Sequence, residues 1–315
     1  MELSIVVPVY RSADCLPELA RRTHDAVSRR FQSYELILVN DDSPDDSWDV
    51  IVRLTRTYPS VVGVNLRRNV GQDNAIMAGL RAASGDVIVI MDDDLQHDPR
   101  DIAALYERVQ SGRDVAYARF EHKQQAIWKN LGSWFNGKVA EWVIDKPPGI
   151  YLSPYKVLRK EVAELICHYD GPYPYVDGLL FQVTAGITQM PVEHRPRFKG
   201  RGNFTFWKSL SVWGQLSVGF SVKPLRVVSA LGFLFALAGL LLAVGIVCYR
   251  LFFPEDFPPN TVGWASLIVA VLITSGIQMF FFGVQGEYVG RTYLKVNHKP
   301  QASVRKVLNA PARQG

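Results

Sequence analysis

The chain has 315 residues, which is room for one large soluble domain and a smaller membrane part. Its formal net charge is +5, and no DNA- or RNA-binding motif accompanies the basic residues. We therefore expect an anionic membrane surface or phosphate substrates as partners, and no nucleic acid. The three cysteines have neither metal-binding nor redox spacing, which argues against a zinc protein or a disulfide-stapled one.

Strands alternate with helices in the N-terminal half of the chain, which predicts an α/β fold with a mostly parallel sheet and right-handed crossovers. No secretory signal precedes the first strand, so we expect this domain in the cytoplasm. We also expect the first strand to break at Pro8, and Asp14 to cap the first helix. The predicted strands are 3–10, 34–39, 61–66, 86–90 and 114–119, and the predicted helices are 16–30, 47–58, 74–83, 127–143 and 160–167.

Acidic residues follow two of the predicted strands. Asp41 follows the second strand, and Asp92-Asp93-Asp94 with Gln96 follow the fourth. Ligands of open α/β sheets bind at this edge, and crowded carboxylates repel one another unless a cation compensates them. On an extended segment Asp92, Asp94 and Gln96 would face one side and Asp93 the other, and such oxygen ligands suit Mg²⁺ or Mn²⁺ shared with substrate phosphates. The alternative is an acidic turn that caps the helix after Pro99.

Several basic or polar residues are candidates for binding phosphate. Arg68 lies just before Gly71, which permits a tight turn. Lys129 and Ser133 are one helical turn apart, and with Arg119 they form a second candidate set. For each of these the alternative is an ordinary solvated or packed side chain. Asp177 follows an aromatic turn, and it is either a general base or a helix cap.

The C-terminal third carries the features of a membrane anchor. Residues 204–224 are rich in aromatics and suit a helix in the membrane interface. Residues 227–249 and 262–286 carry no charge, and each run is long enough to cross a ~30 Å hydrocarbon core. Lysine and arginine flank the pair on both outer sides, which predicts cytoplasmic flanks and an outward link. Small residues in the first run are compatible with helix packing in a homo-oligomer: Gly232, Ala236 and Gly239.

Four motifs now occur together and in order. They are Ile5-Val6-Val7-Pro8-Val9-Tyr10, Val39-Asn40-Asp41-Asp42-Ser43-Pro44-Asp45, Arg68-Asn69-Val70-Gly71 and Asp92-Asp93-Asp94-Leu95-Gln96. With them the chain resembles the inverting glycosyltransferases of family two. Within that family it is similar to the polyprenyl-phosphate glycosyltransferases related to dolichyl-phosphate mannose synthase, and the two C-terminal runs fit the bacterial, bactoprenol-linked branch.

The resemblance implies a Rossmann-like GT-A domain over residues 1–203, interfacial helices over 204–224, a two-helix transmembrane anchor over 225–290 and a cytoplasmic tail over 291–315. It implies transfer of a sugar from a nucleotide-sugar, with UDP favoured, to a polyprenyl phosphate at the inner (plasma) membrane. The implied nucleotide-sugar site is Pro8, Tyr10, Asp41, Arg68, Asp92, Asp93, Arg197 and Arg201. The implied metal ligands for Mg²⁺ or Mn²⁺ are Asp92, Asp94 and Gln96, and the implied catalytic and acceptor-phosphate set is Asp94, Asp177, Arg119, Lys129 and Ser133.

This chain departs from the family pattern at several positions. Asn40 precedes Asp41 where two acids are usual, and Lys129 stands where arginine is common, which removes bidentate phosphate binding. Tyr155-Lys156 stands where Phe-Arg is frequent, and Gly200-Arg201-Gly202-Asn203-Phe204 replaces a usual Gly-x-Ser-x-Tyr.

Two other functions compete with lipid-linked sugar transfer. A processive polysaccharide synthase shares the fold, but the sequence has no Gln-x-x-Arg-Trp motif and only two long apolar runs. A non-catalytic membrane scaffold is the second alternative, and the intact Asp92, Asp94 and Gln96 argue against it.

Overall fold

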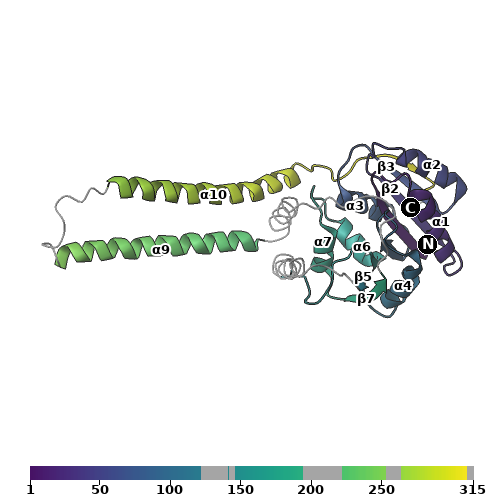
Figure 1. The fold of residues 1–315 in the computed structure, drawn as a ribbon, viewed down its shortest axis with the longest axis horizontal. Coiled ribbons are helices and arrows are strands. Elements are labelled where there is room, and N and C mark those ends of the chain that lie inside the picture. The colour runs from purple at the N-terminus through teal and green to yellow at the C-terminus, as the bar shows by residue number, and fades with distance from the viewer. Residues whose placement is uncertain (122–140, 142–145, 194–221, 253–263, 311–315) are drawn as a thin grey trace. The chain divides into compact units, whose positions relative to one another are not determined.

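The computed structural model describes residues 1–121, 141, 146–193, 222–252 and 264–310 (Figure 1). It divides into two compact units. One unit consists of Met1–Lys208 together with Lys295–Gly315, and the other of Ser209–Leu294. The predicted helix 127–143, apart from residue 141, and residues 204–221 of the predicted interfacial segment 204–224 lie outside the described residues.

An eight-stranded sheet organises the described part of the first unit, in the order β7-β5-β6-β4-β1-β2-β3-β8. Its centre is parallel, because β1 pairs in parallel with both β2 and β4, and β2 with β3. The antiparallel pairs are β4 with β6, β5 with β6, and β3 with β8. The strands are β1 Leu3–Val9, β2 Tyr34–Asn40, β3 Val61–Leu66, β4 Val87–Ile90, β5 Val115–Glu121, β6 Lys156–Arg159, β7 Ile187–Glu193 and β8 Val304–Leu308.

Helices cover both faces of this sheet, because alternate residues of each central strand point to opposite faces. On one face, Ile5 and Val7 of β1 belong to the same core as Leu16 of α1 and Leu105 of α4. On the other face, α3 packs on β1 and β2 and contacts α6 and α7. The helices are α1 Leu16–Val27, α2 Ser47–Thr57, α3 Gln72–Ala82, α4 Ile102–Gln110, α6 Lys160–Cys167 and α7 Val176–Val183, with a 3₁₀ turn η1 at Pro99–Asp101.

The predicted break at Pro8 is wrong, because β1 continues through Pro8 to Val9 and pairs with β2 over its whole length. Pairing between β1 and β4 ends at Val6, whose carbonyl accepts the N–H of Met91 (3.2 Å). The carbonyl of Val9 instead accepts the N–H of Asp41, just after β2 (3.0 Å). The alternation therefore turns Pro8 toward the side of β4, beyond the end of that strand. A residue without an N–H is tolerated there because no partner strand needs one.

The N-cap residue of the first helix is Cys15 rather than the predicted Asp14, and the Cys15 side chain makes no capping bond. Pro17 instead occupies the first turn, where its missing N–H would have no helical partner.

The sequence prediction treated residues 291–315 only as a tail, but the structure places a strand there. After the last helix the chain returns to the first unit, and β8 pairs antiparallel with β3 at the edge of the sheet. Side-chain bonds reinforce the pairing, because the Asn309 amide donates to the carbonyls of Thr55 (2.7 Å) and Val61 (3.3 Å). Residues more than two hundred positions apart are therefore neighbours in one sheet.

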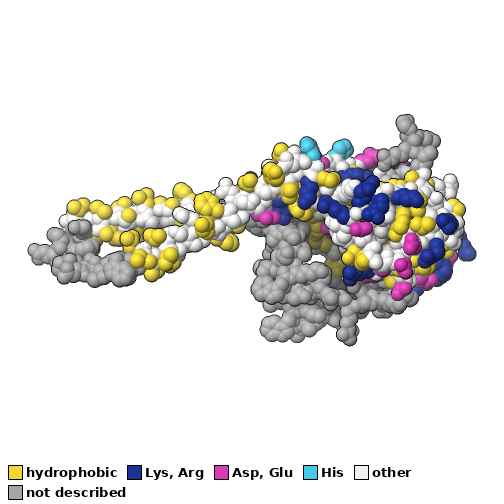
Figure 2. Space-filling model, turned by 90° about the horizontal axis from the view of Figure 1, so that it is seen from above, with side chains coloured by type: hydrophobic (Ala, Val, Ile, Leu, Met, Phe, Trp, Pro, Cys, Tyr) yellow, Lys and Arg dark blue, Asp and Glu magenta, His cyan; other side chains and the backbone are white. Residues whose placement is uncertain are grey.

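The second unit contains two long helices, α9 at Lys223–Phe252 and α10 at Trp264–Val296. Segments Leu225–Tyr249 and Leu267–Val296 are long and apolar enough to cross a membrane, and their most apolar windows bury nothing inside the protein. Figure 2 shows hydrophobic side chains along these helices, in contrast to the charged surface over the sheet domain. A soluble core helix of this composition would be buried, so both segments are candidate membrane spans.

Gly79 sets the distance between α3 and the sheet. A Cβ atom added there would lie 2.4 Å from Cγ1 of Val6 and 3.0 Å from Cγ2 of Val39. Both neighbours are β-branched and stiff at χ1, so they yield little room. We expect Gly79→Ala to destabilise the domain by about 1–3 kcal/mol despite the better helix propensity of alanine. Thermal unfolding would measure this against Arg53→Ala on the exposed face of α2, and an unchanged melting temperature for Gly79→Ala would contradict the close packing.

Candidate active site

The carboxyl ends of the three central strands meet at one edge of the sheet, because β1, β2 and β4 are parallel. Tyr10, Asp41 and the segment Met91–Asp98, here called the acidic segment, follow these ends directly. Strand β6 runs the other way, and its first residue, Lys156, pairs with Ile90 at the end of β4. The sheet therefore brings a lysine beside the acids, a neighbour that strand alternation alone did not predict.

The acidic segment is bent rather than extended. Leu95 has a φ of +62°, so the chain is not extended between Asp94 and Gln96 and strand alternation does not reach Gln96. Asp93 Oδ2 accepts the Tyr10 N–H (3.2 Å), which ties it to the end of β1. Asp92 Oδ1 accepts from Gln72 Nε2 (2.8 Å), and Asp94 Oδ1 accepts the Gln96 N–H (3.1 Å). Burial raises the pKa of Asp93 to about 6, and the charge of Asp94 adds to the rise.

His97 holds the bend in place from within the core. Its Nδ1 accepts the backbone N–H of Asp92 (3.1 Å), which leaves the proton of a neutral imidazole on Nε2. The ring lies 5.0 Å from Tyr155 and 5.6 Å from Phe120, centroid to centroid, and is nearly parallel to both. The sequence analysis missed His97, since a lone histidine three residues after an acidic run carries no motif.

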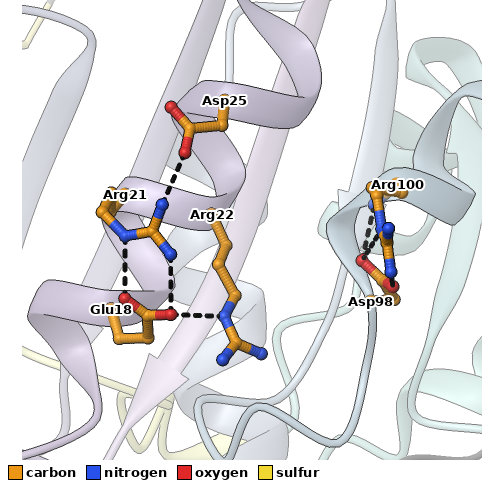
Figure 3. A network of polar contacts seen from close by, with 6 residues as sticks. All are labelled: Glu18, Arg21, Arg22, Asp25, Asp98 and Arg100. Carbon is orange, nitrogen blue, oxygen red and sulfur yellow. Dashed lines mark hydrogen bonds and ion pairs between the residues drawn. The ribbon is translucent and has the colours of Figure 1, made fainter.

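The alternative interpretation of the acidic run was a cap for the helix after Pro99, and the residue that caps the 3₁₀ turn there is Asp98, four residues after the run. Its Oδ1 accepts the Arg100 N–H (3.1 Å), and Oδ2 pairs with Arg100 Nη2 (2.7 Å) at the start of η1 (Figure 3). The other network in Figure 3, Glu18 with Arg21, Arg22 and Asp25, lies on α1. Asp98 is therefore a structural acid next to the candidate site.

Asp41 organises the loop between β3 and α3. Its side chain is buried, and its two carboxylate oxygens accept the N–H groups of Val70 (2.8 Å) and Gly71 (2.9 Å). Gly71 has a φ of +89°, a conformation that favours glycine. Burial raises the pKa of Asp41, and the two N–H groups oppose that rise by stabilising the charged form. The motif Arg68-Asn69-Val70-Gly71 is thus held by the acid of the preceding motif.

A buried ion pair lies beside the acidic segment. Asp177 Oδ1 accepts from Lys156 Nζ and from the hydroxyl of Tyr117 (2.7 Å), and the side chains of Lys156 and Asp177 are only 4% and 13% exposed. Lys156 Nζ also lies 5.2 Å from the centre of the Tyr117 ring. Asp177 is not the cap of α7, because it lies within the first turn of the helix and the N-cap residue is Tyr175. The N–H of Val176 donates to Asp73 Oδ1 (3.2 Å).

The remaining predicted residues divide into three groups. Pro8 is buried within β1, whereas Tyr10 is 44% exposed at the strand end and accessible to a ligand. Arg68 and Arg119 are both exposed, the second on β5. Lys129, Ser133, Arg197 and Arg201 lie outside the described residues.

The oxygen atoms of Asp92, Asp94 and Gln96 are of the hard type that Mg²⁺ and Mn²⁺ prefer. Within the described ranges, no three His, Cys, Asp or Glu side chains form a metal-binding group. A cation that keeps several waters and shares substrate phosphates needs only one or two protein carboxylates. The donor set therefore fits such an ion, bound together with a phosphate ligand.

The family model for glycosyl transferase family 2 matches residues 4–168, which includes the acidic segment and the Asp41-anchored loop. The chain belongs to this family. It is 31% identical over 310 residues to the undecaprenyl-phosphate 4-deoxy-4-formamido-L-arabinose transferase of Yersinia enterocolitica, a match that covers 98% of this chain and 94% of that protein. The predicted resemblance to the polyprenyl-phosphate glycosyltransferases of family 2 is thereby confirmed.

Two solved structures show the same fold as this family 2 chain. Glucosyl-3-phosphoglycerate synthase from Mycobacterium tuberculosis with uridine diphosphate aligns with a TM-score of 0.50 at 15% identity, over 69% of this chain and 78% of that one. The complex of that enzyme with Mn²⁺, UDP-glucose and phosphoglyceric acid gives 0.50 at 16% identity, over 69% and 77%. The predicted GT-A architecture is confirmed.

Asp73 gives a pH-dependent prediction. Burial raises its pKa from 3.8 to about 6, with the negative charge of Asp177 contributing. Because ionisation is disfavoured in the folded state, stability falls as the pH rises from about 4 through about 6. Asp73→Asn keeps an acceptor for the Val176 N–H and removes the charge. We expect it to be more stable than the wild type above pH 7, by up to about 3 kcal/mol, and equal to it below pH 4.

Melting temperatures measured from pH 4 to pH 8 would test this. Asp25→Asn, on the exposed face of α1, is the control and should show no such divergence. A stability difference between Asp73→Asn and wild type that does not change with pH would contradict a raised pKa at Asp73.

Proposed function

We propose that this chain transfers a sugar from a nucleotide-sugar, a UDP-sugar, to a polyprenyl phosphate such as undecaprenyl phosphate at the cytoplasmic face of the membrane. The observation that carries the proposal is the extent of the match to the Yersinia enterocolitica transferase. It covers 98% of this chain, and so includes both candidate spans as well as the sheet domain. The name of that protein specifies an undecaprenyl-phosphate acceptor.

The donor site is assigned to the carboxyl edge of β1, β2 and β4. Tyr10 offers an exposed aromatic face for the base, and Pro8 and Asp41 complete the strand ends around it. Arg68, exposed at the start of the Asp41-anchored loop, is proposed to bind the diphosphate. Asp92, Asp94 and Gln96 would hold Mg²⁺ or Mn²⁺, which supplies positive charge to the departing nucleotide diphosphate.

The proposed sugar transfer needs little help from a general base. A phosphate monoester is largely ionised near neutral pH, so an acceptor oxygen can attack the anomeric carbon with inversion without losing a proton to the protein. Asp177 is held by Lys156 and Tyr117 and serves in this proposal to position groups beside the acidic segment. Arg119, Lys129 and Ser133 are proposed to hold the acceptor phosphate, and Arg197 and Arg201 the donor diphosphate.

The chain's connectivity supports the membrane arrangement. The sheet domain precedes α9, and β8 returns to the same sheet after α10. If both helices cross the bilayer, their outer ends must lie on the same side, because both are attached to one domain. This agrees with cytoplasmic basic flanks on either side of the pair. The spans thus keep the active site where a lipid phosphate can reach it.

The proposal is tested by incubating the full-length protein in detergent with undecaprenyl phosphate and a panel of radiolabelled UDP- and GDP-sugars. We expect an organic-extractable labelled product from one donor, and its loss on adding EDTA. Asp94→Asn should lower transfer at least 100-fold, because charge stabilisation of the leaving group is lost. Asp98→Asn, which removes a nearby structural acid, is the matched control. Unchanged transfer by Asp94→Asn would exclude the assigned role.

The Asp41-anchored loop provides an independent test of the donor site. Asp41→Asn replaces one acceptor oxygen by a donor that faces a backbone N–H, so the loop loses at least one charge-assisted bond. We expect binding of the productive nucleotide-sugar to weaken by about 10- to 100-fold, the range that corresponds to about 1.5–3 kcal/mol. Calorimetry would measure it. The control is Asp42→Asn at the exposed neighbouring position, where φ is +49° and asparagine is well tolerated. Equal affinities for the two variants would contradict the loop's role.

A further inference from the structure

The C-terminal segment contains a buried side chain that no motif pointed to. Gln301 lies between α10 and β8 and is 6% exposed. Its Nε2 donates to the carbonyls of Tyr169 (2.8 Å) and Gly171 (2.7 Å), and its Oε1 accepts from Arg81 Nη2 of α3 (2.7 Å). Both N–H groups and the oxygen of the amide are therefore used. A buried polar group that is fully satisfied fixes its partners in one arrangement.

Both carbonyls belong to the connection between α6 and α7. We call residues 169–177, which run from this connection into the first turn of α7, the 169–177 segment. The rest of this segment is held from α3. Asn74 Nδ2 donates to the carbonyl of Pro172 (3.4 Å), and Asp73 Oδ1 accepts the N–H of Val176. Arg81 Nη2 also donates to the Tyr169 carbonyl (3.1 Å). Gln301 thus completes a set of bonds that fixes the segment from its start to its end.

The segment ends at Asp177, whose carboxylate holds Lys156. Lys156 pairs with Ile90, the residue that directly precedes the acidic segment. A continuous route therefore connects the chain after the second candidate span to the candidate metal-binding acids. It consists of the Gln301 hydrogen bonds, the backbone of the 169–177 segment, the Asp177–Lys156 ion pair and the pairing of Lys156 with Ile90.

We propose that Gln301 is a positioning residue for sugar transfer. It fixes the 169–177 segment, and through it the Asp177–Lys156 pair, so that the pair is held beside the acidic segment. The inference rests on the proposed function, and it assigns a catalytic consequence to the part of the chain that follows the membrane anchor. Since misplacing catalytic groups by about 1 Å costs on the order of 100-fold in rate, loosening the segment should slow the chemical step.

The test compares two amide side chains of the C-terminal segment in the full-length protein. Gln301→Met keeps the volume and removes the bonds to the 169–177 segment. Asn309→Gly removes the amide bonds to the carbonyls of Thr55 and Val61, which belong to α2 and β3, and glycine suits its φ of +54°. Each variant loses two bonds from a side-chain amide to backbone carbonyls. Only the first loses them to the segment that carries Asp177.

We expect Gln301→Met to lower kcat 10- to 100-fold while KM for the nucleotide-sugar stays within threefold. Asn309→Gly should leave both constants within threefold. Hydrogen–deuterium exchange should rise in the 169–177 segment for Gln301→Met and stay at the wild-type level there for Asn309→Gly. Gln301→Glu, which keeps the acceptor for Arg81 and loses both donors, gives the same comparison if Gln301→Met does not fold.

The proposal is overturned if Gln301→Met keeps its kcat, whether or not exchange rises, or if Asn309→Gly loses as much. A fall in kcat without faster exchange in the 169–177 segment also overturns it, because the effect would not pass through that segment. Failure of the wild-type protein to transfer any sugar would instead refute the proposed function. The exchange comparison would still report whether Gln301 holds the segment.

Discussion

The structure around the candidate site depends on one electrostatic constraint, which is that several carboxylates end up at one edge of a parallel sheet. Strands β1, β2 and β4 deliver Tyr10, Asp41 and the acidic segment to the same place. Carboxylates that are close together and partly buried need donors or cations. The fold supplies them individually: two backbone N–H groups for Asp41, the Tyr10 N–H for Asp93, the Gln72 amide for Asp92 and Lys156 for Asp177.

These donors also explain the local geometry. Asp41 accepts two successive N–H groups of a loop in which Gly71 has a positive φ. Asp93 accepts the Tyr10 N–H, and His97 accepts the N–H of Asp92 across the bend at Leu95. At this edge of the sheet the same backbone and side-chain donors therefore both compensate the carboxylate charges and fix the loop conformation. A substitution at a neutral neighbour such as Gln72 or His97 should affect the acids as directly as a substitution of the acids themselves.

Hydrophobic periodicity predicted the central strands and their helices, because alternating buried runs and local turns are properties of neighbouring residues. The strand 61–66 and the helix 160–167 have the predicted bounds. Lys156 and Tyr117 could not be predicted as partners of Asp177, since only antiparallel strand pairing and helix docking bring them to it. Strand β8 was missed for the same reason. Its residues Val304–Leu308 are largely exposed, so burial does not mark them as a strand. They are held in strand conformation by pairing with β3, where Val304 lies opposite Leu66, 238 positions earlier in the chain.

The position of β8 also has a consequence for the order of folding. The sheet's edge at β3 stays uncovered until Val304–Leu308 have been synthesised, after both candidate spans. At about 5–20 residues per second, β8 leaves the ribosome roughly 10–50 s later than β3. During that time the outer edge of β3 is unpaired while the two apolar helices are synthesised, and such edges are prone to pair with other chains. Completion of the sheet would therefore follow synthesis of the anchor, so that a chain arrested before its last strand would carry the motifs of a transferase without β8 on that edge.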